Sequence, residues 1–170
     1  AEVTQIKGDS ETHPLLSPQD SFADFERWDR YNIMNTAKTT PEMLPGSYVR
    51  SALQRGLQFK RSIGVNPYKF GMIGSTDSHT SLSTVNEDNF FGKFANSEPG
   101  VRNSRSMMAG MKNADWELGA SGLSAVWARD NTREEIFAAL KRTAVYATTG
   151  PRLLLRFFGG WHFGAGAIDH

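Results

Sequence analysis

The segment that most constrains the fold is residues 69–74, a short and largely apolar run that contains two glycines. Such a run predicts a strand that is buried on both faces, and strands of this kind belong to parallel sheets. The preceding segment, residues 41–63, repeats apolar side chains every four positions and predicts a helix that ends at Gly64. A helix that leads into a buried strand is one step of an α/β fold.

The rest of the chain continues this alternation of elements. Further strands are expected at residues 2–6, 122–128, 145–147 and 153–158, and further helices at residues 21–32 and from residue 131 onward. Thr132 and Glu135 have the spacing of a capping box, which marks the start of the last helix. Residues 75–122 are rich in Ser, Asn, Gly, Asp and Thr and predict a long loop. The order of elements favours a partial barrel or an open sheet.

Composition narrows the classes of protein to consider. A chain of 170 residues with 39% hydrophobic and 22% charged residues can form one globular domain. The net charge of +1 gives no reason to expect nucleic acid or a membrane surface as a partner. The absence of cysteine excludes disulfides, thiolate metal sites and a cysteine nucleophile, and it suits either the cytoplasm or the periplasm of a bacterium.

Asp77 and His79 are the first candidates for chemistry because they directly follow the strand expected at residues 69–74. If the extended backbone continues, both side chains point the same way at the carboxyl end of that strand, where α/β active sites lie. A carboxylate and an imidazole suit a divalent ion such as Zn, Mn or Fe. The alternative is ordinary loop chemistry, with Asp77 closing a turn and His79 bonded to a backbone carbonyl.

A second polar cluster follows the first expected strand, at residues 7–13. Glu11 and His13 lie in it, again at the exit of a strand, and we expect both to join the metal site. Taken alone, the cluster would more often be a polar turn. Two such clusters at two strand ends support each other, because a metal site in an α/β fold draws ligands from several strands.

Common catalytic motifs of other classes are missing from the sequence. It contains no Gly-x-Ser-x-Gly nucleophile elbow, no phosphate-binding Gly-x-x-x-x-Gly-Lys-Ser/Thr loop and no dinucleotide-binding Gly-x-Gly-x-x-Gly. These absences exclude only the commonest forms of serine hydrolases, nucleoside triphosphatases and dehydrogenases.

Three stretches, residues 5–14, 66–79 and 132–152, resemble a bacterial family catalogued as a domain of unknown function and related to the PHP (polymerase and histidinol phosphatase) metallohydrolases. The resemblance spans nearly the whole chain. It implies a distorted seven-stranded (β/α) barrel that binds up to three divalent metals and hydrolyses phosphoesters. The last metal motif of PHP proteins is Asp-x-His, which matches Asp77 and His79.

One departure from the PHP pattern concerns the start of the barrel. PHP proteins open with a His-x-His motif on their first strand, and this sequence has no such motif. We therefore expect residues 1–170 to form a single domain that is the C-terminal part of a longer barrel, with a long loop after the Asp-x-His strand. The missing motif would lie upstream of Ala1, and this chain would carry part of the metal shell.

The function expected from this resemblance is that of a metal-dependent hydrolase, in particular a phosphoesterase acting on a small molecule. The expected metal ligands are Asp77, His79, His13 and Glu11, and the expected substrate contacts are Lys7, Arg105 and Ser75. Two alternatives stay open: a non-catalytic binding module with a vestigial metal site, and hydrolysis of amides or other esters by the same metals. The strand edges of a partial barrel favour a homo-oligomer.

Overall fold

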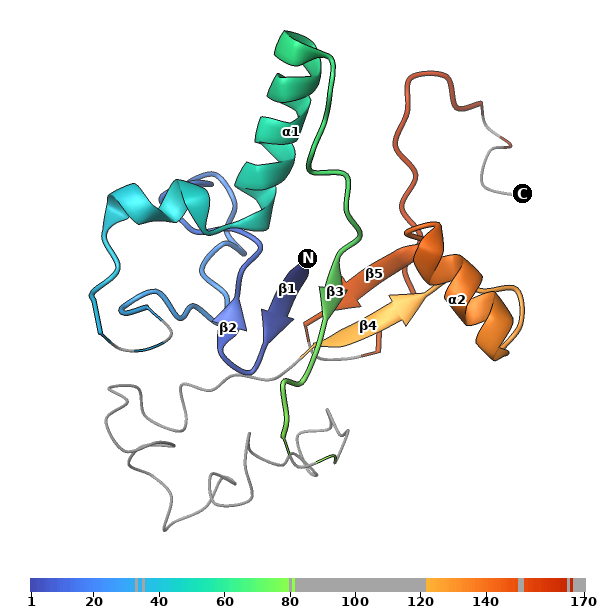
Figure 1. The fold of residues 1–170 in the computed structure, drawn as a ribbon, viewed down its shortest axis with the longest axis horizontal. Helices are drawn as coiled ribbons and strands as arrows, with labels where there is room; N and C mark the ends of the chain where they lie inside the picture. Colours follow the sequence, from blue (N-terminus) through green and yellow to red (C-terminus); the bar gives the residue numbers. More distant parts are fainter. Residues whose placement is uncertain are drawn as a thin grey trace.

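The computed structural model describes residues 1–32, 34, 36–79, 81, 122–149, 152–164 and 166. Most of the loop expected at residues 75–122, including Arg105, lies outside this described part. Figure 1 shows the elements in chain order, which are β1 (Glu2–Gln5), β2 (Gly8–Asp9), the 3-10 helix η1 (Pro41–Gly46), α1 (Val49–Ile63), β3 (Ile73–Gly74), β4 (Leu123–Val126), α2 (Arg133–Lys141) and β5 (Val145–Thr148). None of the helices in the described part is both long and apolar enough to cross a membrane.

The strands form two small sheets. In the first, the order is β2-β1-β3, with β1 antiparallel to β2 and parallel to β3. In the second, β4 and β5 pair antiparallel in continuous register from Leu123 opposite Thr148 to Val126 opposite Val145. The parallel pairing expected for the strand before Asp77 is therefore present, with α1 in the connection between β1 and β3 (Figure 1).

The two sheets meet at β3, where glycines allow a close approach. Ser124 Oγ on β4 donates to the Gly74 carbonyl at 2.7 Å, and the Gly122 amide donates to the Ser75 carbonyl at 3.0 Å. A Cβ atom added at Gly122 would overlap the Thr148 carbonyl and the Thr4 methyl group. The junction thus needs a residue without a side chain at Gly122.

The backbone amides in the first turn of α1 donate to carbonyls of another segment instead of to a capping side chain. The amides of Val49 and Arg50 donate to the carbonyls of Ser10 and Glu11, both at 3.0 Å. This pairing ties the start of α1 to the segment after β2. As expected, the helix ends at Gly64, whose φ of 78° is the left-handed conformation that glycine adopts without strain.

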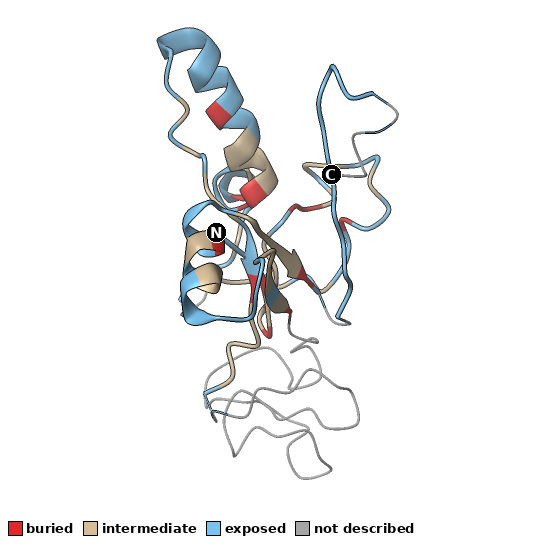
Figure 2. Ribbon diagram, turned by 90° about the vertical axis from the view of Figure 1, so that its right-hand side faces the viewer, coloured by how far each residue is buried: buried red, intermediate tan, exposed pale blue. Residues whose placement is uncertain are grey.

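Most of the buried apolar residues lie in or next to β1 and near the start of α1 (Figure 2). They include Val3, Ile6, Tyr48 and Val49, while Ala139 is buried on α2. The distal part of α1 is exposed, with Leu57 and Ile63 each 68% exposed.

Three of the expected elements differ in the structure. Residues 21–32 form turns instead of a helix, because the Phe22 amide donates to Asp20 Oδ1 at 3.0 Å and the Glu26 carbonyl accepts from the Asp9 amide at 2.8 Å. The strand expected at residues 69–74 covers only Ile73 and Gly74, and it is not buried on both faces because Ile73 is 36% exposed.

The strand expected at residues 153–158 does not form either. Its backbone is held instead by two aromatic donors of the second sheet: Tyr146 Oη donates to the Leu153 carbonyl at 2.7 Å and Trp127 Nε1 to the Leu155 carbonyl at 3.2 Å. The apolar side chains of this segment are exposed, Leu154 and Phe157 to 88% each.

Candidate functional site

Lys7, Asp77 and His79 come together just beyond the ends of the parallel strands β1 and β3. Lys7 Nζ forms an ion pair with Asp77 Oδ2, and His79 Nε2 lies 3.3 Å from Asp77 Oδ1. Lys7 and Asp77 are 70 positions apart in the sequence. The structure thus unites one expected substrate contact with the two residues of the Asp-x-His motif.

The backbone reaches this arrangement in an unexpected way. Asp77 has a φ of 47°, so the extended conformation does not continue from β3 to His79. The condition under which period-two alternation would align the two side chains is therefore not met. Aspartate tolerates the left-handed region better than most residues do. The turn at Asp77 brings its carboxylate and the His79 ring together by bending the chain.

The separation of the two side chains fits a pair of metal ligands. Two ligands at about 2.0–2.1 Å from a tetrahedral zinc ion lie about 3.3–3.4 Å apart, close to the 3.3 Å between Asp77 Oδ1 and His79 Nε2. The His79 side chain is 50% exposed and that of Asp77 21%, so an ion can reach them from solvent. Across the described residues, however, no group of three or more His, Asp or Glu side chains gathers as a metal cluster would.

Ser75 directly follows β3 and pairs with the neighbouring strand β1. Its amide donates to the Thr4 carbonyl at 3.0 Å, and its hydroxyl donates to Glu2 Oε1. The hydroxyl expected to contact substrate is thus bonded to a carboxylate of β1. A substrate would have to compete with Glu2 for it.

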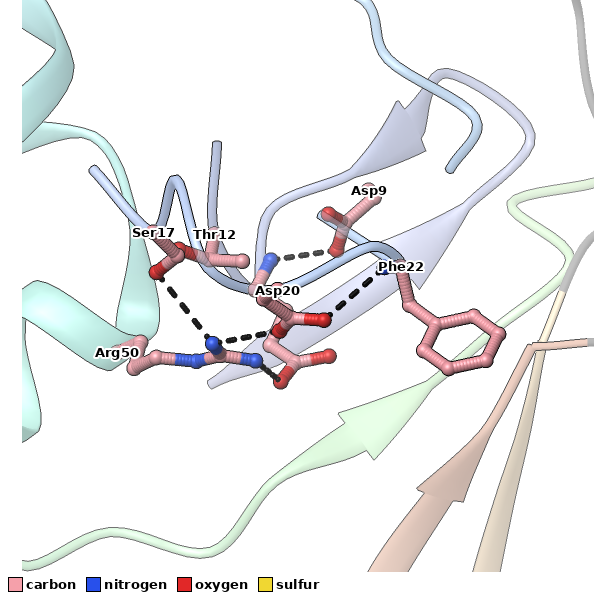
Figure 3. Close-up of polar contacts among 7 residues, drawn as sticks. Asp9, Thr12, Ser17, Asp20, Phe22 and Arg50 are labelled. Atoms are coloured by element: carbon pink, nitrogen blue, oxygen red, sulfur yellow. Dashed lines mark hydrogen bonds and ion pairs between the residues drawn. The ribbon is translucent and has the colours of Figure 1, made fainter. Parts of the chain in front are cut away.

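Figure 3 shows a different cluster, centred on Arg50 of α1 with Ser17 and Asp20. Glu11 belongs to this cluster. Arg50 Nη2 contacts Glu11 Oε1 at 2.5 Å, and Nη1 contacts Asp20 Oδ2 at 2.8 Å and Ser17 Oγ at 3.4 Å. The hydrogen bond from Arg50 lowers the pKa of Asp20, and Glu11 raises the pKa of Arg50. These contacts of Arg50 connect the segment after β2 to α1.

His13 is buried, with its side chain only 5% exposed. Its Nδ1 accepts from the Leu15 amide at 3.1 Å, which leaves the ring proton on Nε2 to donate to Asp29 Oδ2 at 2.8 Å. Both ring nitrogens therefore have partners. The structure shows no contact between His13 or Glu11 and the pair Asp77–His79 among the residues that it describes. Arg105, the remaining expected site residue, lies outside them.

A cavity of about 240 Å³ next to Lys7 was not anticipated from the sequence. Its lining residues come from the β1–β2 hairpin, the segment after it and the residues before α1: Glu2, Gln5, Lys7, Gly8, Asp9, Ser10, Trp28, Tyr31, Ser47 and Tyr48. Burial raises the pKa of Asp9 to about 6 and is also the main cause that raises the pKa of Tyr48. Trp28 and Tyr31 fall in the segment that was expected to be helical. The sequence therefore did not predict that they line a cavity together with the β1–β2 hairpin.

Comparison with known proteins gives one match. A family model described as "Protein of unknown function (DUF3604)" matches residues 1–170. A search of curated proteins found no match, and neither did a search of solved structures.

Proposed function

We propose that this chain supplies part of the active site of a PHP-like metal-dependent phosphoesterase. The chain belongs to the family described as "Protein of unknown function (DUF3604)", as its resemblance to a family of unknown function predicted. The observation that carries the proposal is the meeting of Lys7, Asp77 and His79 beyond the ends of β1 and β3. Active sites of parallel α/β folds lie at this end of the strands.

Asp77 and His79 are the residues that would hold a divalent ion. Their 3.3 Å separation fits two ligands of one ion, and the Asp-x-His motif matches the last metal motif of the PHP proteins. A bound Zn, Mn or Fe ion supplies Lewis acidity toward a phosphoryl oxygen and toward water. The other ligands would come from outside the described residues.

Lys7 is the residue that would stabilise the charge of the phosphoester. Its ammonium group is fixed beside the Asp77 carboxylate, so it places a positive charge next to the proposed metal ligands. Preorganised cations aimed at a transferring phosphoryl group lower the barrier because the charge on its oxygens is stabilised without reorganisation. Lys7 is thus a positioning and charge-neutralising group rather than a nucleophile.

The proposal is tested with the full-length protein and three substrates: para-nitrophenyl phosphate, para-nitrophenyl acetate and an anilide. Wild-type protein with Mn or Zn should hydrolyse para-nitrophenyl phosphate, and chelation should abolish the activity. Lys7→Ala should lower kcat about 100-fold, by analogy with the loss of one preorganised charge-stabilising group. Hydrolysis of para-nitrophenyl acetate or an anilide without hydrolysis of the phosphate would overturn the phosphoesterase assignment in favour of ester or amide chemistry.

A non-catalytic binding module is the second candidate function. The observation in its favour is the exposure of aromatic side chains in the C-terminal segment, where Trp161 is 97% and Phe163 58% exposed. Exposed aromatic residues are typical of contact surfaces. A full-length protein that hydrolyses neither the two esters nor the anilide and contains no metal would favour this candidate.

A further inference from the structure

The cavity beside the β1–β2 hairpin has the composition of a binding site for a small ligand. It measures about 240 Å³, somewhat below the roughly 300–1,000 Å³ of pockets for drug-sized molecules. Its walls combine two carboxylates, those of Glu2 and Asp9, with the aromatic residues Trp28, Tyr31 and Tyr48.

The shape of the cavity depends on Gly8. This residue has a φ of 101°, and a Cβ atom added to it would overlap the Glu26 carbonyl and lie 3.1 Å from the Trp28 amide nitrogen. The chain at residues 26–28 can therefore lie directly against β2, where the Asp9 amide donates to the Glu26 carbonyl at 2.8 Å. The wall that carries Trp28 is thus held in place by backbone contacts.

Neither carboxylate of the cavity forms an ion pair with another described residue. Glu2 accepts hydrogen bonds from Gln5 Nε2 and Ser75 Oγ, and Asp9 accepts one from the Glu11 amide. Lys7, a cation of the same lining, forms an ion pair with Asp77. Within the described part of the chain, the lining therefore has more negative than positive charge.

Tyr48 adds a largely buried aromatic side chain to the same wall. The residue is only 8% exposed, and its ring lies 5.7 Å from the His13 ring between centroids.

We propose that this cavity binds a small alkylammonium ion. Aromatic faces attract cations through their quadrupoles, and quaternary ammonium groups are recognised in proteins by aromatic residues placed around them. Glu2 and Asp9 supply the compensating negative charge, and the Tyr48 phenol can bond to a hydroxyl carried by the ligand. A sugar could stack on the same rings, but it would bring no positive charge to the two carboxylates. This inference is independent of the proposed phosphoesterase activity.

Calorimetric titration of the full-length protein with choline tests the proposal. The control ligand is 3,3-dimethyl-1-butanol, which has the shape of choline without its charge. Choline should bind at millimolar concentration or below, and the neutral alcohol about tenfold more weakly or not at all, because only the cation gains from the ring quadrupoles and the carboxylates. Equal binding of the two ligands, no binding of choline, or binding of glucose in place of choline would overturn the proposal.

Variants locate the binding to this cavity. Glu2→Gln removes a charge from an exposed side chain, and Trp28→Leu removes a ring while keeping an apolar group; each should weaken choline binding about tenfold. Glu134→Gln, on the exposed face of α2, is the matched control and should leave the affinity unchanged. If Trp28→Leu fails to fold by circular dichroism, Glu2→Gln decides. Unchanged affinity in Glu2→Gln, or equal loss in Glu134→Gln, would contradict the assignment.

Discussion

Thr4 is completely buried on β1, and its Oγ1 has no hydrogen-bond partner among the described residues. A buried hydroxyl without a partner costs about 1–3 kcal/mol. Thr4→Val replaces this hydroxyl by a methyl group of similar size and should raise the free energy of unfolding by about 1 kcal/mol. Urea denaturation measures the change, and a loss of stability would contradict the account.

The same substitution at Thr132 should have the opposite effect. Thr132 caps α2, and its Oγ1 accepts from the Glu135 amide at 3.3 Å, as the spacing in the sequence predicted. Thr132→Val removes this acceptor and should lower the free energy of unfolding by about 1 kcal/mol. Opposite signs for the two Thr→Val variants in one urea series would separate a hydroxyl that bonds from one that does not.

Asp9 links stability to pH. Burial raises its pKa from 3.8 to about 6, so the contribution of Asp9 to the free energy of unfolding is fully present below pH 3.8 and is lost as the pH rises through 6. Asp9→Asn removes this loss. Since Asp9 is only half-buried, solvent screening reduces the effect, and we expect Asn to be more stable by roughly 1 kcal/mol at neutral pH. Thermal melts should show no difference below pH 3.8, and a less stable variant at neutral pH would contradict the assignment.

At the scale of elements, the junction between the sheets depends on Gly122. Gly122→Ala forces a Cβ atom against the Thr148 carbonyl and the Thr4 methyl group, so the free energy of unfolding should fall by about 2 kcal/mol. Gly46→Ala is the matched control, because an added Cβ there meets no atom within 4 Å. Urea denaturation that shows equal stability for the two variants would contradict the proposed packing.

Elements with strong local signals were predictable from the sequence. One or two residues are enough to predict each of two helix ends: Gly64 marks the end of α1, and Thr132 with Glu135 marks the start of α2. The helix predicted at residues 21–32 does not form, because the Asp20 side chain and the Asp9 amide bond to backbone groups that a helix would use. The strand predicted at residues 153–158 does not form. Trp127 and Tyr146 donate hydrogen bonds to carbonyls of this segment, where a neighbouring strand would otherwise do so.

The candidate site was predictable only in part. The Asp-x-His motif pointed to Asp77 and His79, and Lys7 meets them although it is far away in sequence. The left-handed turn at Asp77 left no recognisable signal. Neither Glu11 nor His13 is in contact with this pair in the described residues, because an arginine holds the first and an aspartate the second. Such pairings depend on the path of the chain and not on local spacing.

At the scale of the whole molecule, the proposed function requires that Asp77 and His79 bind a divalent ion in the full-length protein. An ion that binds the folded state alone also stabilises it by mass action. Added Mn or Zn should therefore raise the Tm of the wild type, and His79→Ala should lose most of this increase.

The metal content of purified full-length protein, measured by elemental analysis, decides whether Asp77 and His79 hold a divalent ion. Three proteins are compared: the wild type, His79→Ala, and His162→Ala as the control for losing an exposed histidine elsewhere. We expect bound Zn, Mn or Fe in the wild type and in His162→Ala, and less metal in His79→Ala. Equal metal content in all three proteins would contradict this expectation.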